Sequence, residues 1–245
     1  MRAALAGLCG GNRASYKADM RARIEGSEAG AAAPRMVLVE LLTVAVLAAA
    51  FLVMFRARPG YVDLLLAVVA VGFIVAGLGR SRRLWDLHRP DAPGETRLLH
   101  ASAASAAFTL VALAGLFAAA FIAAPGDGAA VSDRLSNPRI VGAFLLYLPW
   151  ALLQQFVFQF YLLGRLLVLL PVSGAVAITA LAFSLVHFPR VPVMVVTLVA
   201  GAAWALIYRR YRVLLPLAVS HALLGSALHY WVFGRDLLAN WLGVR

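Results

Sequence analysis

Apolar residues fall in runs long enough to cross a bilayer, and polar residues gather in the segments between them. A membrane-spanning helix needs about 20 mainly apolar residues. The fifth run is short and ends where Pro189 and Pro192 break the helix. The candidate spans are residues 36–55, 62–79, 101–124, 140–163, 173–188, 191–208 and 213–233. This pattern predicts an all-α fold, a polytopic integral membrane helical bundle of about seven transmembrane helices.

Composition supports this prediction and excludes several classes of protein. Hydrophobic residues make up 63% of the 245 residues and charged residues only 13%, which is outside the range of soluble domains. The net charge of +11 comes from short basic clusters between apolar runs, so it indicates membrane topology and no nucleic-acid partner. Cys9 is the only cysteine, which excludes an intrachain disulfide.

Four regions follow from the polar and apolar pattern. Residues 1–35 lack a sustained apolar period and are predicted to be a disordered tail, unless translation starts at Met36. Residues 36–138 hold the N-terminal transmembrane helices, residues 139–233 the core with the candidate site, and residues 234–245 a C-terminal tail. Most of the 22 Lys and Arg residues fall on the side of the N-terminus, which is therefore expected in the cytoplasm. The predicted location is the bacterial inner (plasma) membrane.

The longest polar stretch within the apolar region runs from Arg80 to His100. Its carboxylates and histidines, such as Asp86 and His88, could be considered as metal ligands. No two of them share a spacing that forces them to converge, so an amphipathic interfacial connector with Trp85 at headgroup depth is favoured. We expect no metal and no other cofactor.

Polar side chains interrupt the apolar runs of the second half of the chain. A buried amide without a partner costs about 2–7 kcal/mol, and an ionisable group inside a bundle must face a cavity or a partner. Helical spacing places Gln155 with Gln159 on one face, and His221 with Gly225 on another. The side chains are Gln154, Gln155, Gln159, Ser184, His187, His221 and His229. Three helices can therefore turn a polar stripe towards a common interior.

The order of these motifs resembles a known family. Phe183 to His187 forms an F-x-x-x-H motif, a Gly-containing helix then ends at Tyr208 and Arg209, and His221 lies on the next helix. This combination resembles the CPBP family, which contains the CAAX prenyl endopeptidases and bacteriocin-processing intramembrane proteases and is also called the Abi family. The resemblance covers roughly residues 140–232.

The departures from the family pattern fall on its catalytic positions. Members resemble one another in a Glu-Glu-x-x-x-Arg motif, whereas this chain has Gln154, Gln155 and Gln159 at those places. The family's asparagine, four residues after the last histidine, is Gly225. The resemblance implies that the positions equivalent to catalytic ones are Gln154, Gln155, His187 and His221. It implies a cavity lined by Gln159, Phe183, Ser184 and Gly225.

Two functions and one structural alternative remain open. The first is a protein that no longer cleaves peptides by the glutamate mechanism and binds an apolar or lipidated partner, such as a prenylated peptide or a membrane protein. The second is a divergent intramembrane endopeptidase that uses histidines, alone or with a metal. The structural alternative is that the histidines only make hydrogen bonds between packed helices. About 12 Å of helix separates His229 from His221, which excludes a shared metal ion.

Overall fold

The computed structural model describes residues 37–39, 41–42, 72 and 94–236. The chain divides into two compact units, Met1–Ala49 and Ala50–Arg245. In the first unit, residues 37–39 and 41–42 are helical. The predicted spans at 36–55 and 62–79 lie almost entirely outside the described residues. So do the predicted tail at 1–35, residues 80–93 of the polar connector, and residues 237–245 of the C-terminal tail.

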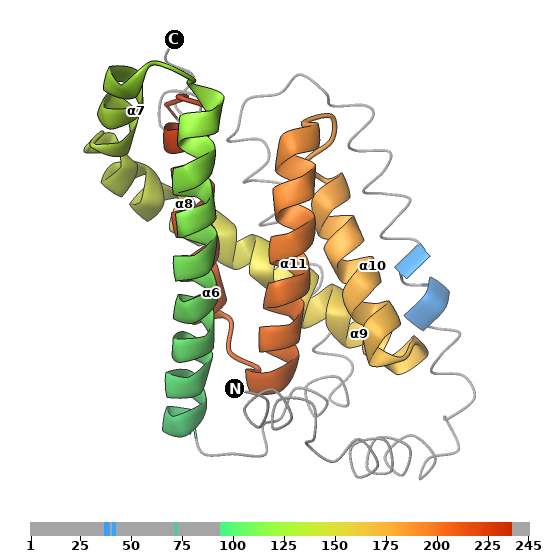
Figure 1. Ribbon diagram of the computed structural model, residues 1–245. Helices are drawn as coiled ribbons and strands as arrows, with labels where there is room; N and C mark the ends of the chain where they lie inside the picture. Colours follow the sequence, from blue (N-terminus) through green and yellow to red (C-terminus); the bar gives the residue numbers. More distant parts are fainter. Residues whose placement is uncertain (1–36, 40, 43–71, 73–93, 237–245) are drawn as a thin grey trace, which may run out of the picture. The chain divides into compact units, whose positions relative to one another are not determined.

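The described part of the second unit is helical and contains no strand (Figure 1). Three of its helices are long and apolar enough to cross a membrane, at Glu95–Ala123, Arg139–Leu169 and Val191–Tyr211. The elements are α6 (Gly94–Ala123), α7 (Gly128–Leu135), α8 (Arg139–Gln155), the π-helix η1 (Phe156–Leu162), α9 (Leu163–Leu169), α10 (Val172–Leu185), α11 (Val191–Tyr211), α12 (Leu215–Ala227) and the π-helix η2 (Leu228–Val232). The prediction of an all-α membrane bundle is confirmed.

Helix boundaries differ from the predicted ones where local chemistry overrides the apolar pattern. Helix α6 begins at Gly94, so the end of the predicted polar connector is helical. The helix that starts at Arg139 continues to Leu169 and stops where Leu170 becomes extended before Pro171. Helix α10 ends at Leu185 and not at residue 188, because residues 186–189 form turns before Arg190.

Helix α7 was missing from the predicted elements. Asp127 begins it by accepting a hydrogen bond from the backbone N–H of Ala130 at 2.9 Å. Only Val131 of this eight-residue helix is buried. It is too short and too polar to span a bilayer, so a search for apolar runs does not find it.

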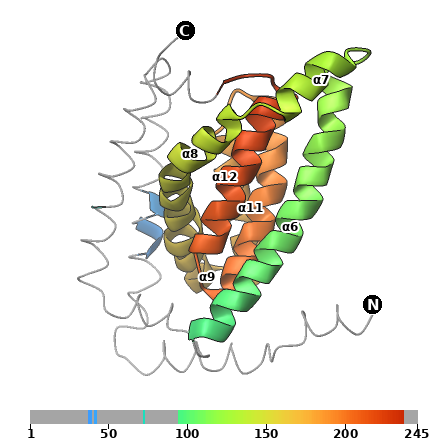
Figure 2. The ribbon, with the colours of Figure 1, turned by 90° about the vertical axis from the view of Figure 1, so that its left-hand side faces the viewer.

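Close helix packing forms the core around α12. Helix α12 packs against α8 and α6 (Figure 2). Helix α11 packs against α10 (Figure 1) and α6. A Cβ atom at Gly201 would lie 3.3 Å from the Ala180 Cα atom, so glycine lets α11 approach the backbone of α10. The Ser184 hydroxyl adds a bond from α10 to α11 by donating to the Met194 carbonyl at 2.7 Å.

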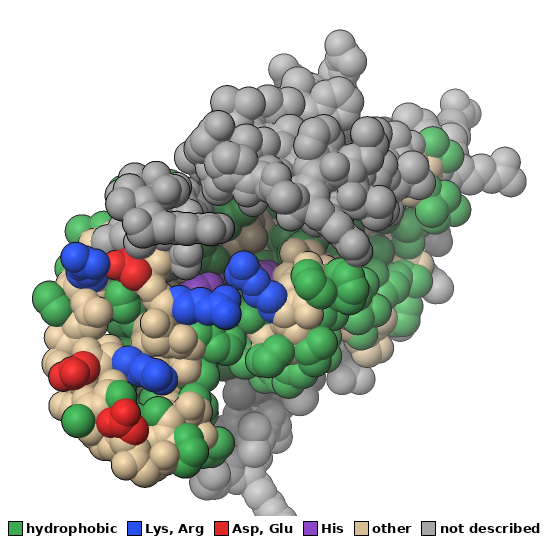
Figure 3. Space-filling view, turned by 90° about the horizontal axis from the view of Figure 1, so that it is seen from above, with side chains coloured by type: hydrophobic (Ala, Val, Ile, Leu, Met, Phe, Trp, Pro, Cys, Tyr) green, Lys and Arg blue, Asp and Glu red, His purple; other side chains and the backbone are tan. Residues whose placement is uncertain are grey.

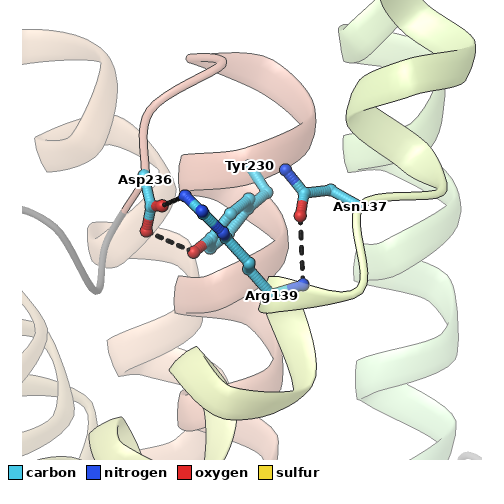
Figure 4. A network of polar contacts seen from close by, with 4 residues as sticks. All are labelled: Asn137, Arg139, Tyr230 and Asp236. Carbon is cyan, nitrogen blue, oxygen red and sulfur yellow. Dashed lines mark hydrogen bonds and ion pairs between the residues drawn. The ribbon is translucent and has the colours of Figure 1, made fainter.

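A polar network joins the start of α8 to the residues after η2 (Figure 4). Arg139 Nη1 lies 2.8 Å from Asp236 Oδ2, and the Tyr230 hydroxyl donates to Asp236 Oδ1 at 2.6 Å. The Asn137 side chain accepts a bond from the backbone N–H of Arg139 at 3.0 Å. The network fixes the residues after η2 against the start of α8, the helix that carries Tyr147 and Gln155.

Candidate functional site

A π-helical turn places the glutamines inside the bundle. Helix α8 ends at Gln155, and η1 follows without a break as far as Leu162. The side chains of Gln155 and Gln159 are completely buried, while that of Gln154 is partly buried. π-helical segments inside longer helices occur frequently at functional sites. The sequence predicted one continuous helix here, and no composition signal distinguishes the π-helical turn from an ordinary one.

His221 lies on α12 between two polar partners. The Gln155 Nε2 atom lies 3.5 Å from His221 Nδ1, and the Tyr147 hydroxyl oxygen lies 3.3 Å from His221 Nε2. As this amide is oriented, it donates to Nδ1, so the neutral imidazole carries its proton on Nε2 and donates to the tyrosine oxygen. Both ring nitrogens of this buried histidine are therefore engaged by uncharged groups.

Aromatic rings enclose the same imidazole. The His221 ring centroid lies 4.8 Å from that of Trp204 and 5.3 Å from that of Phe183. Phe183 also contacts the ring of His187, at a centroid distance of 5.2 Å. One phenylalanine thus lies against both histidines of the predicted site. The predicted histidines and the predicted phenylalanine come together in the core.

A hydrogen-bond chain fixes the tryptophan over His221. The Trp204 indole N–H donates to the Ser220 hydroxyl at 3.0 Å. The Ser220 and Thr109 hydroxyl oxygens are 2.7 Å apart and hydrogen-bonded. This chain joins α11, α12 and α6, and all three side chains are buried. Sequence reasoning missed these three residues and Tyr147, because single Thr, Ser, Trp and Tyr residues within apolar helices carry no motif.

His187 has one nitrogen engaged. It lies in the turn after α10, and its Nδ1 atom donates to the Phe183 carbonyl at 2.8 Å. The neutral ring then has a lone pair on Nε2. Ser184, also predicted to line the cavity, is buried with its hydroxyl committed to the Met194 carbonyl.

Gly225 makes room for Tyr147. A Cβ atom at this position would lie 2.6 Å from Tyr147 Cε1, which is closer than real Cβ atoms approach. The tyrosine ring therefore packs directly on the α12 backbone, one turn after His221. Any side chain at position 225 must displace this ring.

The described residues contain no group of three or more His, Cys, Asp or Glu side chains that could hold a metal ion. His229 donates from Nδ1 to the Gly225 carbonyl at 2.9 Å, and no contact joins it to His221. The residues at this site suit hydrogen bonding to a neutral group better than metal coordination.

Gln159 is completely buried, and neither atom of its amide has a hydrogen-bond partner among the described residues. Leaving such a group unsatisfied costs about 1–3 kcal/mol. We therefore expect Gln159→Leu to raise the free energy of unfolding by about 1–3 kcal/mol in the partner-free protein. Denaturant titration in mixed micelles measures this change.

Gln155→Leu is the matched control, because it removes an amide that is bonded to His221 and should lower stability. Equal destabilisation by the two substitutions would show that the Gln159 amide is satisfied in the partner-free protein.

These features define a class of protein: an all-helical membrane protein with a glutamine and histidine site enclosed by its helices. Residues 135–226 match the family model described as type II CAAX prenyl endopeptidase Rce1-like. The match covers less than half of the chain and supports the resemblance to the CPBP family through this segment. No curated protein and no solved structure matches the chain.

Proposed function

We propose that this protein binds an apolar or lipidated partner in its helical core and does not cleave peptides by the glutamate mechanism. One observation carries the proposal: the side chain beside His221 is the Gln155 amide, where the family resemblance implies a carboxylate. Between Arg139 and Arg235 the sequence has no Asp or Glu at all. No neighbouring carboxylate in this segment is available to replace the missing base.

The chemistry of glutamine limits the reaction. Its amide oxygen is not basic at neutral pH, so it positions a water molecule without deprotonating it. General base catalysis contributes about 10²- to 10⁴-fold, and one oxyanion donor about 10²- to 10³-fold. The implied oxyanion asparagine is Gly225, whose space is taken by the Tyr147 ring. Both contributions are therefore absent from the family's positions.

Free hydrogen-bonding capacity supports binding. The Oε1 atoms of Gln154 and Gln155 and both amide atoms of Gln159 lack partners among the described residues. A partner with an amide or hydroxyl group would satisfy them, and such satisfaction is worth more in an apolar surrounding than in water. Large apolar side chains are exposed on the surrounding helices, which supports an apolar or lipidated partner.

A histidine-dependent endopeptidase is the second candidate, and the free Nε2 of His187 favours it. Its tautomer is fixed by the Phe183 carbonyl, which leaves an acceptor for a proton from water. His221, with both nitrogens engaged, is less suited to that role. In this candidate His187 is the base and the glutamines orient the water.

Membrane topology is part of the proposal. The positive-inside distribution of Lys and Arg favours an N-terminus in the cytoplasm and a bacterial inner-membrane location.

The test separates binding from cleavage. The full chain, purified in micelles, is offered a prenylated peptide and the same peptide without its lipid. We expect tighter binding of the prenylated peptide, weaker binding in Gln159→Leu, and no cleavage above background. Mass spectrometry of the peptide measures cleavage, and fluorescence anisotropy measures binding.

Cleavage that is lost in His187→Ala and only reduced in Gln155→Ala would establish the second candidate. Absence of binding to either peptide would leave the site as helix packing alone.

A further inference from the structure

Two turns with the same hydrogen-bond pattern, one after α10 and one after η2, lie at one end of the described helices. His187 donates from Nδ1 to the carbonyl four residues earlier, that of Phe183, and His229 does the same to Gly225 (2.8 and 2.9 Å). Each histidine carbonyl in turn accepts the backbone N–H of an arginine, Arg190 at 3.0 Å and Arg235 at 2.9 Å. We name His187, Arg190, His229 and Arg235 the arginine–histidine cluster.

Histidine and basic side chains gather on one face at this end of the described helices (Figure 3). The charge of Arg190 acts on both imidazoles, and that of Arg235 acts on His229. With Nδ1 donating in both rings, each Nε2 atom faces away from its own helix backbone and has no hydrogen-bond partner among the described residues. The cluster therefore offers two cationic forks and two imidazole nitrogens.

Among the described residues, no carboxylate neutralises the two arginines of the cluster. Arg190 and Arg235 are exposed, and neither has an ion-pair partner in the described part of the chain. The carboxylate next along the chain, Asp236, is occupied by Arg139 and Tyr230 (Figure 4). Viewed from above Figure 1, histidine side chains lie between basic side chains, with hydrophobic side chains beside them (Figure 3).

The charge decides which kind of ligand fits. Two free imidazole nitrogens alone would suit a metal ion, but two unpaired guanidinium groups beside them repel a cation. Guanidinium forks bind phosphate oxygens in pairs, and an imidazole Nε2 accepts the proton of a monoprotonated phosphate or, once protonated, donates to its oxygen. An anion with several oxygens satisfies all four groups at once.

We propose that the arginine–histidine cluster binds the phosphate group of an anionic lipid. A lipid is favoured over free phosphate because large apolar side chains border the cluster. Phe188 and Val191, on either side of the turn that carries Arg190, are 61% and 62% exposed. They offer a surface for the acyl chain while the phosphate lies on the guanidinium groups. Gln154, Gln155 and Gln159 take no part in this binding, and His187 is the one residue that the cluster shares with the candidate site.

The experiment titrates the full chain in neutral micelles at low ionic strength with three probes. These are dihexanoyl phosphatidic acid, dihexanoyl phosphatidylcholine and inorganic phosphate, with binding measured by isothermal titration calorimetry. Arg190→Gln and Arg235→Gln are compared with Arg210→Gln. Arg210 is the matched control, because it is an exposed arginine at the opposite end of α11.

We expect phosphatidic acid to bind more tightly than phosphatidylcholine or inorganic phosphate. Each cluster arginine should donate a charge-assisted hydrogen bond to the phosphate. Losing either arginine should therefore weaken the binding of phosphatidic acid about tenfold. Arg210→Gln should change it less than about twofold, since Arg210 lies at the opposite end of α11 from the cluster. Arg190→Lys should recover part of the loss, because it restores the charge without the fork.

Equal affinity for phosphatidic acid and phosphatidylcholine would overturn the proposal. So would equal losses from Arg190→Gln and Arg210→Gln, which would show ordinary interfacial arginines. Inorganic phosphate binding as tightly as phosphatidic acid would overturn the lipid assignment. Failure of the lipid-binding experiment would not affect the proposed function of the core site. That function is tested separately, by peptide binding and by Gln159→Leu.

Discussion

Trp204→Ala is expected to lower the free energy of unfolding by about 3–5 kcal/mol. The side chain is 1% exposed, lies against His221 and Phe183, and donates to Ser220. Removing it leaves a cavity that the surrounding helices only partly fill, and it leaves the Ser220 and Thr109 pair without its third member. Packing and interhelical hydrogen bonds hold membrane helices together, so removing the Trp204 side chain lowers stability even where lipid surrounds the bundle.

Unfolding in mixed micelles, followed by circular dichroism, measures the change. Leu206→Ala is the control on the same helix, because this side chain is 49% exposed and its loss should cost well under about 1 kcal/mol. Trp204→Phe separates the two contributions. It keeps most of the ring and removes the hydrogen bond, which is worth about 0.5–1.5 kcal/mol. Similar losses from Trp204→Ala and Leu206→Ala would contradict the assigned packing.

Gly225→Asn is expected to destabilise the protein by about 1–3 kcal/mol, although it restores the residue that the family resemblance implies. The first atom of any side chain here would lie 2.6 Å from the Tyr147 ring. The ring must move away, and its hydroxyl then leaves His221 Nε2. Shortening the tyrosine removes the obstacle, so Tyr147→Ala should rescue part of the loss in the double variant.

A double-mutant cycle measures this coupling, which should exceed about 0.5 kcal/mol for two groups in contact. Gly115→Ala on α6 is the control, because nothing lies within 4 Å of the added methyl group. It should stabilise the helix by about 0.5–1 kcal/mol. Additive effects of the two site substitutions would show that Gly225 and Tyr147 do not depend on each other.

The same contact limits any attempt to restore peptidase activity. Gln154→Glu, Gln155→Glu, Gln159→Arg and Gly225→Asn together recreate the implied family motif. The structure indicates that Tyr147 must be shortened in the same protein, since otherwise the asparagine cannot occupy its place. A restored variant with the native tyrosine is therefore a poor test of the glutamate mechanism.

Most of the helices could be predicted from the sequence. Bilayer-length apolar runs place α6, α8 with its π-helical extension, and α11 close to their observed positions, because burial in lipid requires an unbroken apolar stretch. The ends of the helices were predicted less accurately than their positions. Gly94 starts α6 within a polar segment, and turns after Leu185 shorten α10. The Asp127 N-cap of α7 is visible in the sequence, but this eight-residue helix is too short to be found by a search for membrane spans.

The sequence by itself determined that this is a helical membrane protein that resembles the CPBP family. It also identified the glutamines and histidines of the candidate site by their cost in an apolar surrounding. Only the tertiary structure decided which groups meet. Tyr147 reaches His221 because Gly225 lacks a side chain, and Trp204 is held over the same ring by Ser220. Each of these contacts joins residues on different helices. Helical periodicity fixes the face on which a side chain lies, but the neighbour that it meets depends on the rotation and spacing of helices packed together.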